Sequence, residues 1–171
     1  MTTWLHYAIG YGFATVVAHF PICWLVDRLY VSIGENPASH GRNRPGGWLT
    51  KIVGFVERAL YVGAINNGAI SFIGLWLVLK FAGQWSTWRD GIKDGDRVLS
   101  GQSVLNIFLI ANGVSIAYAL VGAYLIPLVR ESVWASILVP VALLAATAVL
   151  RHVATRYAEE DKRDAGTGSA A

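Results

Sequence analysis

Long apolar stretches alternate with short polar segments along the chain. Asp, Glu, Lys and Arg are absent from four of these stretches: 7–26, 59–79, 104–129 and 132–150. Each is close to the roughly 20 residues that a helix needs to cross the hydrocarbon layer of a membrane. The pattern predicts an all-α integral membrane protein, an antiparallel bundle of four transmembrane helices over about 5–29, 57–81, 104–129 and 132–151.

The polar segments set the expected boundaries of this domain, which covers residues 1–157. Prolines and glycines make 35–47 an irregular loop, and the helix that follows it is expected to run as far as Phe81. Pro21 should kink the end of the first helix. The remaining residues, 158–171, are polar or small and are predicted to be a disordered tail.

Four spans would place both termini on the same side of the membrane, together with the 80–103 loop. The 27–58 loop and the turn at 130–131 would share the other side. Lys and Arg number eight on the side of the termini and six on the opposite side. Because Lys and Arg favour cytoplasmic loops, this difference predicts cytoplasmic termini.

Composition supports a membrane location and excludes several classes of protein. Of the 171 residues, 54% are hydrophobic and 15% are charged, against about 25% charged in soluble domains. This argues against a soluble enzyme, a secreted disulfide scaffold and a nucleic-acid-binding module. Cys23 is the one cysteine, and no spacing of His and Cys matches a metal site, so we predict neither a metal nor a cofactor.

Small residues recur every four positions in the first helix, at Gly10, Ala14 and Ala18. Such a stripe allows two membrane helices to approach closely. We therefore expect this helix to pack tightly against a neighbour. The partners predicted from the sequence are the lipid bilayer and either further copies of the chain or another membrane protein.

Three dipeptides that pair an acid with an arginine stand at predicted helix ends. They are Asp27-Arg28, Glu57-Arg58 and Arg130-Glu131. In a four-span topology all three would lie at one membrane face, as the rim of a pathway or of a lipid-headgroup site. The alternative is three ordinary helix ends whose arginines reach toward lipid phosphates.

Glu57 lies on a small, polar helix face that should pack inward. A carboxylate in that position is costly unless it is paired. Because Arg58 lies on another face, the expected partner of Glu57 is Arg28 or Arg130.

Polar side chains also interrupt the apolar stretches. Asn66, Asn67 and Asn112 lie within predicted spans. They could form hydrogen bonds between helices, or they could line a path for an ion or a small solute.

One segment of the chain resembles a known group of proteins. The residues that carry the resemblance are Gly54-Phe55-Val56-Glu57-Arg58, Ile73-Gly74, Lys80, Phe108-Leu109-Ile110 and Ser115. Their pattern is similar to that of uncharacterised bacterial multi-pass membrane proteins with a Gly-x-x-Glu-Arg helix, over about Gly54 to Gly122. The resemblance implies a bacterial inner-membrane location and no particular activity, and it gives weight to Glu57, Arg58 and Lys80.

Three functions remain open on the sequence. The first is a non-enzymatic membrane protein that forms or supports a path for a small solute or an ion. The second is an accessory or scaffold subunit whose small-residue faces bind partner helices. The third is an enzyme that acts on lipid headgroups with Asp27, Glu57 or His40 as acid or base, although no paired catalytic spacing supports it.

Overall fold

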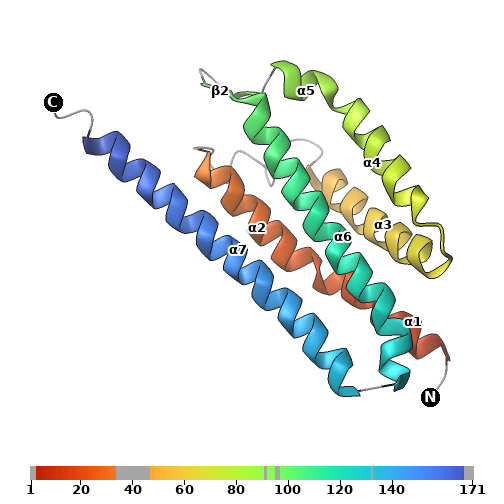
Figure 1. The fold of residues 1–171 in the computed structure, drawn as a ribbon. Helices are drawn as coiled ribbons and strands as arrows, with labels where there is room; N and C mark the ends of the chain where they lie inside the picture. The colour runs from red at the N-terminus through yellow and green to blue at the C-terminus, as the bar shows by residue number, and fades with distance from the viewer. Residues whose placement is uncertain (1–2, 34–46, 91, 95–96, 132, 168–171) are drawn as a thin grey trace.

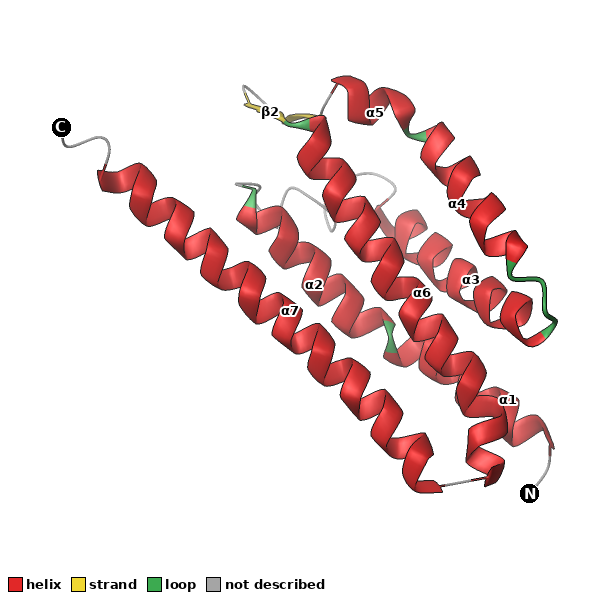
Figure 2. Ribbon diagram, viewed as in Figure 1, coloured by secondary structure: helices red, strands yellow, loops and turns green. Residues whose placement is uncertain are grey.

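The computed structural model describes residues 3–33, 47–90, 92–94, 97–131 and 133–167. These residues are almost entirely helical, with one short β-hairpin in which β1 and β2 pair antiparallel (Figure 2). The elements in chain order are α1 (Thr3–Gly12), the π-helix η1 (Phe13–Val17), α2 (His19–Ser32), α3 (Gly47–Asn66), α4 (Ser71–Gly83), α5 (Trp85–Asp90), β1 (Ile92–Asp94), β2 (Arg97–Leu99), α6 (Gly101–Glu131) and α7 (Val133–Thr167).

Three long rods form the body of the molecule: α1–η1–α2, α6 and α7 (Figure 1). Within the described residues, three helices are long and apolar enough to cross a membrane, namely Trp4–Ser32, Gly101–Val129 and Ile137–Arg156. The expectation of helices that can span a membrane is therefore confirmed for three segments.

The helix expected to continue to Phe81 breaks after Asn66. The chain turns at 67–70, and α4 runs back beside α3 toward the end of the bundle where α3 began (Figure 1). Gly68 has φ 70°, Gly68 N–H donates to Ile65 O (3.1 Å), and Ala69 N–H donates to Ala64 O (2.8 Å). This is the Schellman ending, which requires a left-handed residue and is most often made by glycine. A single span over 57–81 is thus replaced by a helical hairpin.

An irregular turn precedes Pro21 in the first rod. Ala18 N–H donates to Phe13 O at 3.0 Å, a five-residue spacing that widens the helix. Pro21 has no N–H, and its ring conflicts with the carbonyl four residues earlier, at Val17. The distortion that we expected in the last turns of this helix therefore lies one turn earlier, in η1.

Close packing of small residues joins α1 to α6. A Cβ placed on Gly10 would collide with the Gly122 carbonyl, and one placed on Gly122 would lie 2.7 Å from the Ala14 Cβ. Ala14 and Ala18 are fully buried. The predicted small-residue stripe is therefore a helix–helix interface.

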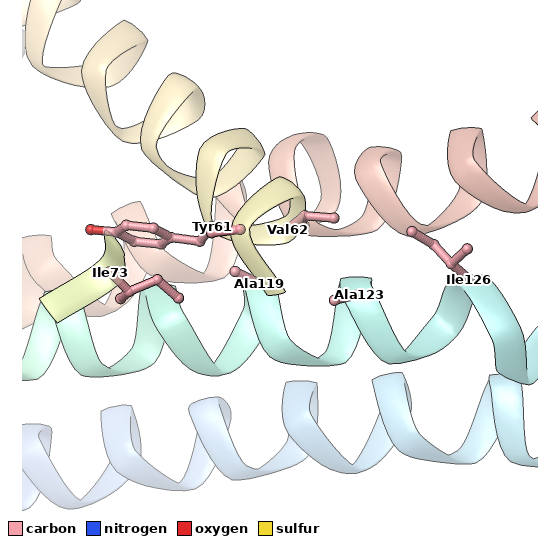
Figure 3. Packing of buried hydrophobic residues seen from close by; sticks show 8 residues of the cluster. Tyr61, Val62, Ile73, Ala119, Ala123 and Ile126 are labelled. Atoms are coloured by element: carbon pink, nitrogen blue, oxygen red, sulfur yellow. The ribbon is translucent and has the colours of Figure 1, made fainter. Parts of the chain in front are cut away.

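A second apolar cluster joins the α3–α4 hairpin to α6. Figure 3 shows Tyr61 and Val62 of α3 and Ile73 of α4 above the α6 residues Ala119, Ala123 and Ile126. The hairpin is therefore packed against the central helix rather than standing apart from it.

The two ends of the bundle differ from the predicted arrangement. The first residues of α1 lie at the end where α6 meets α7, and the last residues of α7 lie at the opposite end, beyond the end of α2 (Figure 1). We call these the N-terminal end and the C-terminal end. The two ends of the described chain therefore lie at opposite ends of the bundle. The α3–α4 hairpin begins and ends at the C-terminal end, so it adds no crossing from one end of the bundle to the other.

The C-terminal helix is also longer than expected. We predicted a polar tail without structure over 158–171, whereas α7 continues to Thr167. Residues 168–171 lie outside the described part of the chain.

Candidate functional site

The fold-back of α4 on α3 creates an ion pair. Lys80 Nζ lies 2.8 Å from Glu57 Oε2. These residues are 23 positions apart, so a continuous helix would hold them about 35 Å apart. The pair therefore exists only because the chain reverses at 67–70.

Two more side chains complete this cluster. Trp76 Nε1 donates to Glu57 Oε1 at 3.0 Å, so both carboxylate oxygens accept a hydrogen bond. Lys80 Nζ also donates to Asn112 Oδ1 of α6 at 3.0 Å. The Asn112 amide is itself oriented, because its nitrogen donates to Phe108 O at 2.7 Å. We call Glu57, Trp76, Lys80 and Asn112 the Glu57 cluster.

The Glu57 cluster is shielded from the surroundings. Glu57 is 4% exposed and Asn112 is 7% exposed, whereas the Lys80 side chain retains 24% exposure. A buried carboxylate is tolerated when a cation and further donors satisfy it. The expected partner of Glu57 was Arg28 or Arg130, so this expectation is corrected: the partner is Lys80.

Arg58, the neighbour of Glu57, points to a different part of the molecule. It is 3% exposed, and its Nη2 donates to the Thr15 carbonyl of η1 at 3.3 Å. Its Nε has no hydrogen-bond partner among the described residues. Arg58 thus links α3 to the widened turn of the first rod and carries a charge that no carboxylate in the described chain pairs directly.

Tyr61 lies one helical turn after Glu57. The side chain is fully buried, and its hydroxyl has no hydrogen-bond partner in the described residues. It lies on the same face of α3 as Glu57, four residues further along the helix. A polar group without a partner therefore accompanies the Glu57 cluster.

The structure does not gather the three acid–arginine dipeptides into one rim. Asp27 and Arg28 are exposed near the end of α2, at the C-terminal end of the bundle (Figure 1). Arg130 and Glu131 finish α6 at the N-terminal end. Glu131 is exposed, and the Arg130 side chain lies outside the described part. The four-span topology that placed all three at one face fails at the α3–α4 turn.

The three asparagines are also separated. Asn66 and Asn67 are exposed, and their side-chain nitrogens donate to Val62 O (3.0 Å) and Gly63 O (2.7 Å) of their own helix. They help α3 to end, whereas Asn112 belongs to the Glu57 cluster. They do not form a common polar lining.

Other chemistry is sparse in the described chain. No group of three or more His, Cys, Asp and Glu that could hold a metal ion occurs among the residues that the structure describes. His40 falls outside the described residues.

Sequence reasoning missed Trp76 as a member of the site and placed Lys80 at the far end of a continuous helix from Glu57. The signal that could have revealed them is the sequence Asn66-Asn67-Gly68, which is typical of a helix end. This signal is missed when hydropathy is averaged over a long apolar stretch.

No family model, curated protein or solved structure matches the chain in the three comparisons.

Proposed function

We propose that the chain crosses the membrane three times, through α1–α2, α6 and α7, and that α3–α4 is a re-entrant hairpin. α4 has 13 residues, or about 20 Å of helix, against a hydrocarbon layer of about 30 Å. Both ends of the hairpin open toward the C-terminal end of the bundle (Figure 1). Non-helical backbone at such depth is tolerated where protein or a water-filled cavity surrounds it.

The distribution of basic residues supports this topology. Among the Lys and Arg residues in the described elements, only Arg130 belongs to the N-terminal end. Three crossings therefore give a much stronger bias than the eight-to-six division of a four-span topology. Since Lys and Arg favour the cytoplasmic side, we propose that the C-terminal end faces the cytoplasm and that the start of α1 faces away from it, in a bacterial inner membrane.

For the function, we propose a non-enzymatic role in forming or supporting a path for an ion or a small solute. The observation that carries this proposal is the ion pair between Glu57 and Lys80, placed among apolar helices and held across the two arms of the hairpin. Ionisable groups in membrane segments are costly and are kept mainly where they act on ions, protons or solutes.

The geometry suggests how such a path would be controlled. Lys80 joins Glu57 of α3 to Asn112 of α6, so it fixes α4 to both neighbours. A proton or a cation that neutralises Glu57 competes with Lys80 for the carboxylate. Release of Lys80 would then free α4 from α3, and Lys80 keeps enough exposure to reach water or a headgroup.

Flux measurements in liposomes test this function. Purified wild-type protein, Glu57→Gln, Lys80→Gln and the control Lys51→Gln would be reconstituted, and proton and ion flux would be followed under imposed gradients. Lys51 is exposed on the same helix as Glu57, so its variant controls for a change of charge. We expect flux in the wild type and the control, and altered flux in both cluster variants. Absence of flux under every gradient, or equal flux in all four proteins, would contradict the proposal.

An accessory or scaffold role is the second candidate, and one observation favours it. In the most apolar stretch of α7 only 6% of the residues are buried, compared with 39% and 33% in the corresponding stretches of α1–α2 and α6. A partner helix or a second copy of the chain could cover this face. Co-purification of a partner in fixed stoichiometry, lost when Leu138 and Val141 are changed to Trp, would support it, and a monomer in mild detergent with no partner would oppose it.

The lipid-headgroup enzyme has no support in the site. Glu57 is buried in its ion pair, and Asp27 lies on a different element at the surface.

A further inference from the structure

A second polar cluster lies where α2 meets α7. The guanidinium carbon of Arg151 lies 3.2 Å from the centre of the Trp24 ring, so the two groups are stacked. Arg28 follows Trp24 by four residues and therefore shares its face of α2. Arg151 and Trp24 thus meet where α2 packs on α7, and Arg28 follows on the same face of α2.

The positive charges of this cluster have no matching negative charge in the described chain. Neither arginine forms an ion pair there, and Nε of Arg151 is buried without a hydrogen-bond partner. Asp27 is adjacent in sequence and exposed, but it pairs with neither arginine. Stacking on Trp24 orients the guanidinium plane and attracts the cation through the ring quadrupole, but it supplies no anion.

The surroundings of the cluster are apolar and open. Val149, Leu150 and Val153 of α7 are exposed, and Trp24 is 41% exposed. Exposed apolar residues beside Arg151 suit acyl chains, and a tryptophan beside two arginines is typical of the boundary between hydrocarbon and headgroups. The cluster also belongs to the half of the bundle that carries most of the basic residues, where an anionic cytoplasmic leaflet is expected.

We propose that Arg28 and Arg151 bind the phosphate of an anionic phospholipid headgroup, with Trp24 holding Arg151 in place. The planar fork of a guanidinium group matches two phosphate oxygens, and a phosphate held by both arginines would supply the negative charge that neither finds in the described chain. The site requires that α2 and α7 lie in a membrane, and it is independent of any path at Glu57.

Titration with defined lipids tests this site. Protein in detergent micelles would be titrated with phosphatidylglycerol or phosphatidylcholine, and bound lipid would be counted by native mass spectrometry. For Arg28→Gln/Arg151→Gln we expect phosphatidylglycerol binding to weaken about tenfold or more, since each basic group near a membrane surface contributes about 1 kcal/mol. Arg156→Gln is the matched control, because Arg156 is exposed on α7 and already donates to His152.

Two further arms separate the possible outcomes. Arg28→Gln alone changes an exposed residue, so it should fold and still lose several-fold in binding. Millimolar inorganic phosphate should not displace the lipid. Binding of phosphatidylglycerol that is equal in wild type and Arg28→Gln, or equal to that of phosphatidylcholine, would overturn the proposal. Displacement by inorganic phosphate would overturn it as well, in favour of a site for a free anion.

Discussion

The contact between α1 and α6 and the contact between the α3–α4 hairpin and α6 depend on different forces. The first is made by Gly10, Ala14 and Gly122, whose backbones approach so closely that a methyl group does not fit. The second combines an apolar cluster with the Glu57–Lys80 ion pair and its hydrogen bonds. Close packing acts at all pH values, whereas an ion pair can be opened by a proton or a competing ion. The comparison teaches that the hairpin contact depends on charged side chains, whereas the contact between α1 and α6 does not.

The largest expected effect comes from removing one partner of the ion pair. Lys80→Met leaves Glu57 buried beside Trp76 without a cation, and we expect a loss of about 3–5 kcal/mol of stability. Chemical unfolding in detergent, followed by circular dichroism, measures this loss. Glu57→Gln combined with Lys80→Met should recover a large part of it, since no unpaired charge then remains. A loss below about 1 kcal/mol in Lys80→Met would show that the pair does not hold the hairpin.

A smaller but clear effect is expected at the close-packed interface. Gly122→Leu inserts a side chain where even a Cβ would lie 2.7 Å from Ala14, and overpacking of this kind costs about 1–3 kcal/mol. Gly113→Leu is the matched control on the same helix, because a Cβ at Gly113 meets nothing within 4 Å. Thermal unfolding of both variants in the same detergent checks the difference. Equal melting temperatures would contradict the packing of α1 on α6.

The smallest effect concerns the contact between α6 and α7. Tyr118 Oη and Thr147 Oγ1 lie 3.1 Å apart, and both side chains are buried. Thr147→Val removes this hydrogen bond at similar volume, and interhelical bonds in membranes contribute about 0.6 kcal/mol on average. A double-mutant cycle with Tyr118→Phe measures the coupling. A coupling above about 2 kcal/mol would make this bond as important as the hairpin contacts.

The close-packed contact between α1 and α6 could be predicted from the sequence, whereas the contact of the hairpin with α6 could not. Uncharged blocks identified the long rods around 7–26, 104–129 and 132–150, and the spacing of Gly10, Ala14 and Ala18 identified a tight interface. These features depend on local composition and period, which the sequence displays directly. The span at 57–81 was wrong because the apolar character continues across the turn, while the Asn66-Asn67-Gly68 ending interrupts the helix.

The Glu57 cluster depends on the reversal of the chain between α3 and α4. The sequence could therefore point to individual residues of the cluster but not to their contacts with one another. Glu57 was recognised as a buried carboxylate that needs a partner, but a continuous helix placed Lys80 at the other membrane face. One helix ending reverses the direction of α4 and thereby changes the partner of Glu57 and the sides on which the ends of the chain lie. Errors of this kind propagate because each span inherits its orientation from the one before.

Topology can be measured independently of the site. Reporter fusions that are active on only one side of the membrane would be joined before α1 and after α7. We expect the C-terminal fusion to report the cytoplasm and the N-terminal fusion to report the opposite side, since three crossings separate them. If both fusions report the same side, the chain crosses the membrane an even number of times, which would contradict three crossings.

Cross-linking of the two arms of the hairpin tests the central claim most directly. In a Cys23→Ala background, Glu57→Cys and Lys80→Cys would be joined by a short bifunctional thiol reagent in native membranes, with Glu57→Cys and Tyr61→Cys as the control pair on one helix. The fold-back predicts efficient cross-linking within a single chain for both pairs. Cross-linking of the control pair alone would mean that residues 57 and 80 are about 35 Å apart on a continuous helix, which would contradict the hairpin on which the ion pair depends.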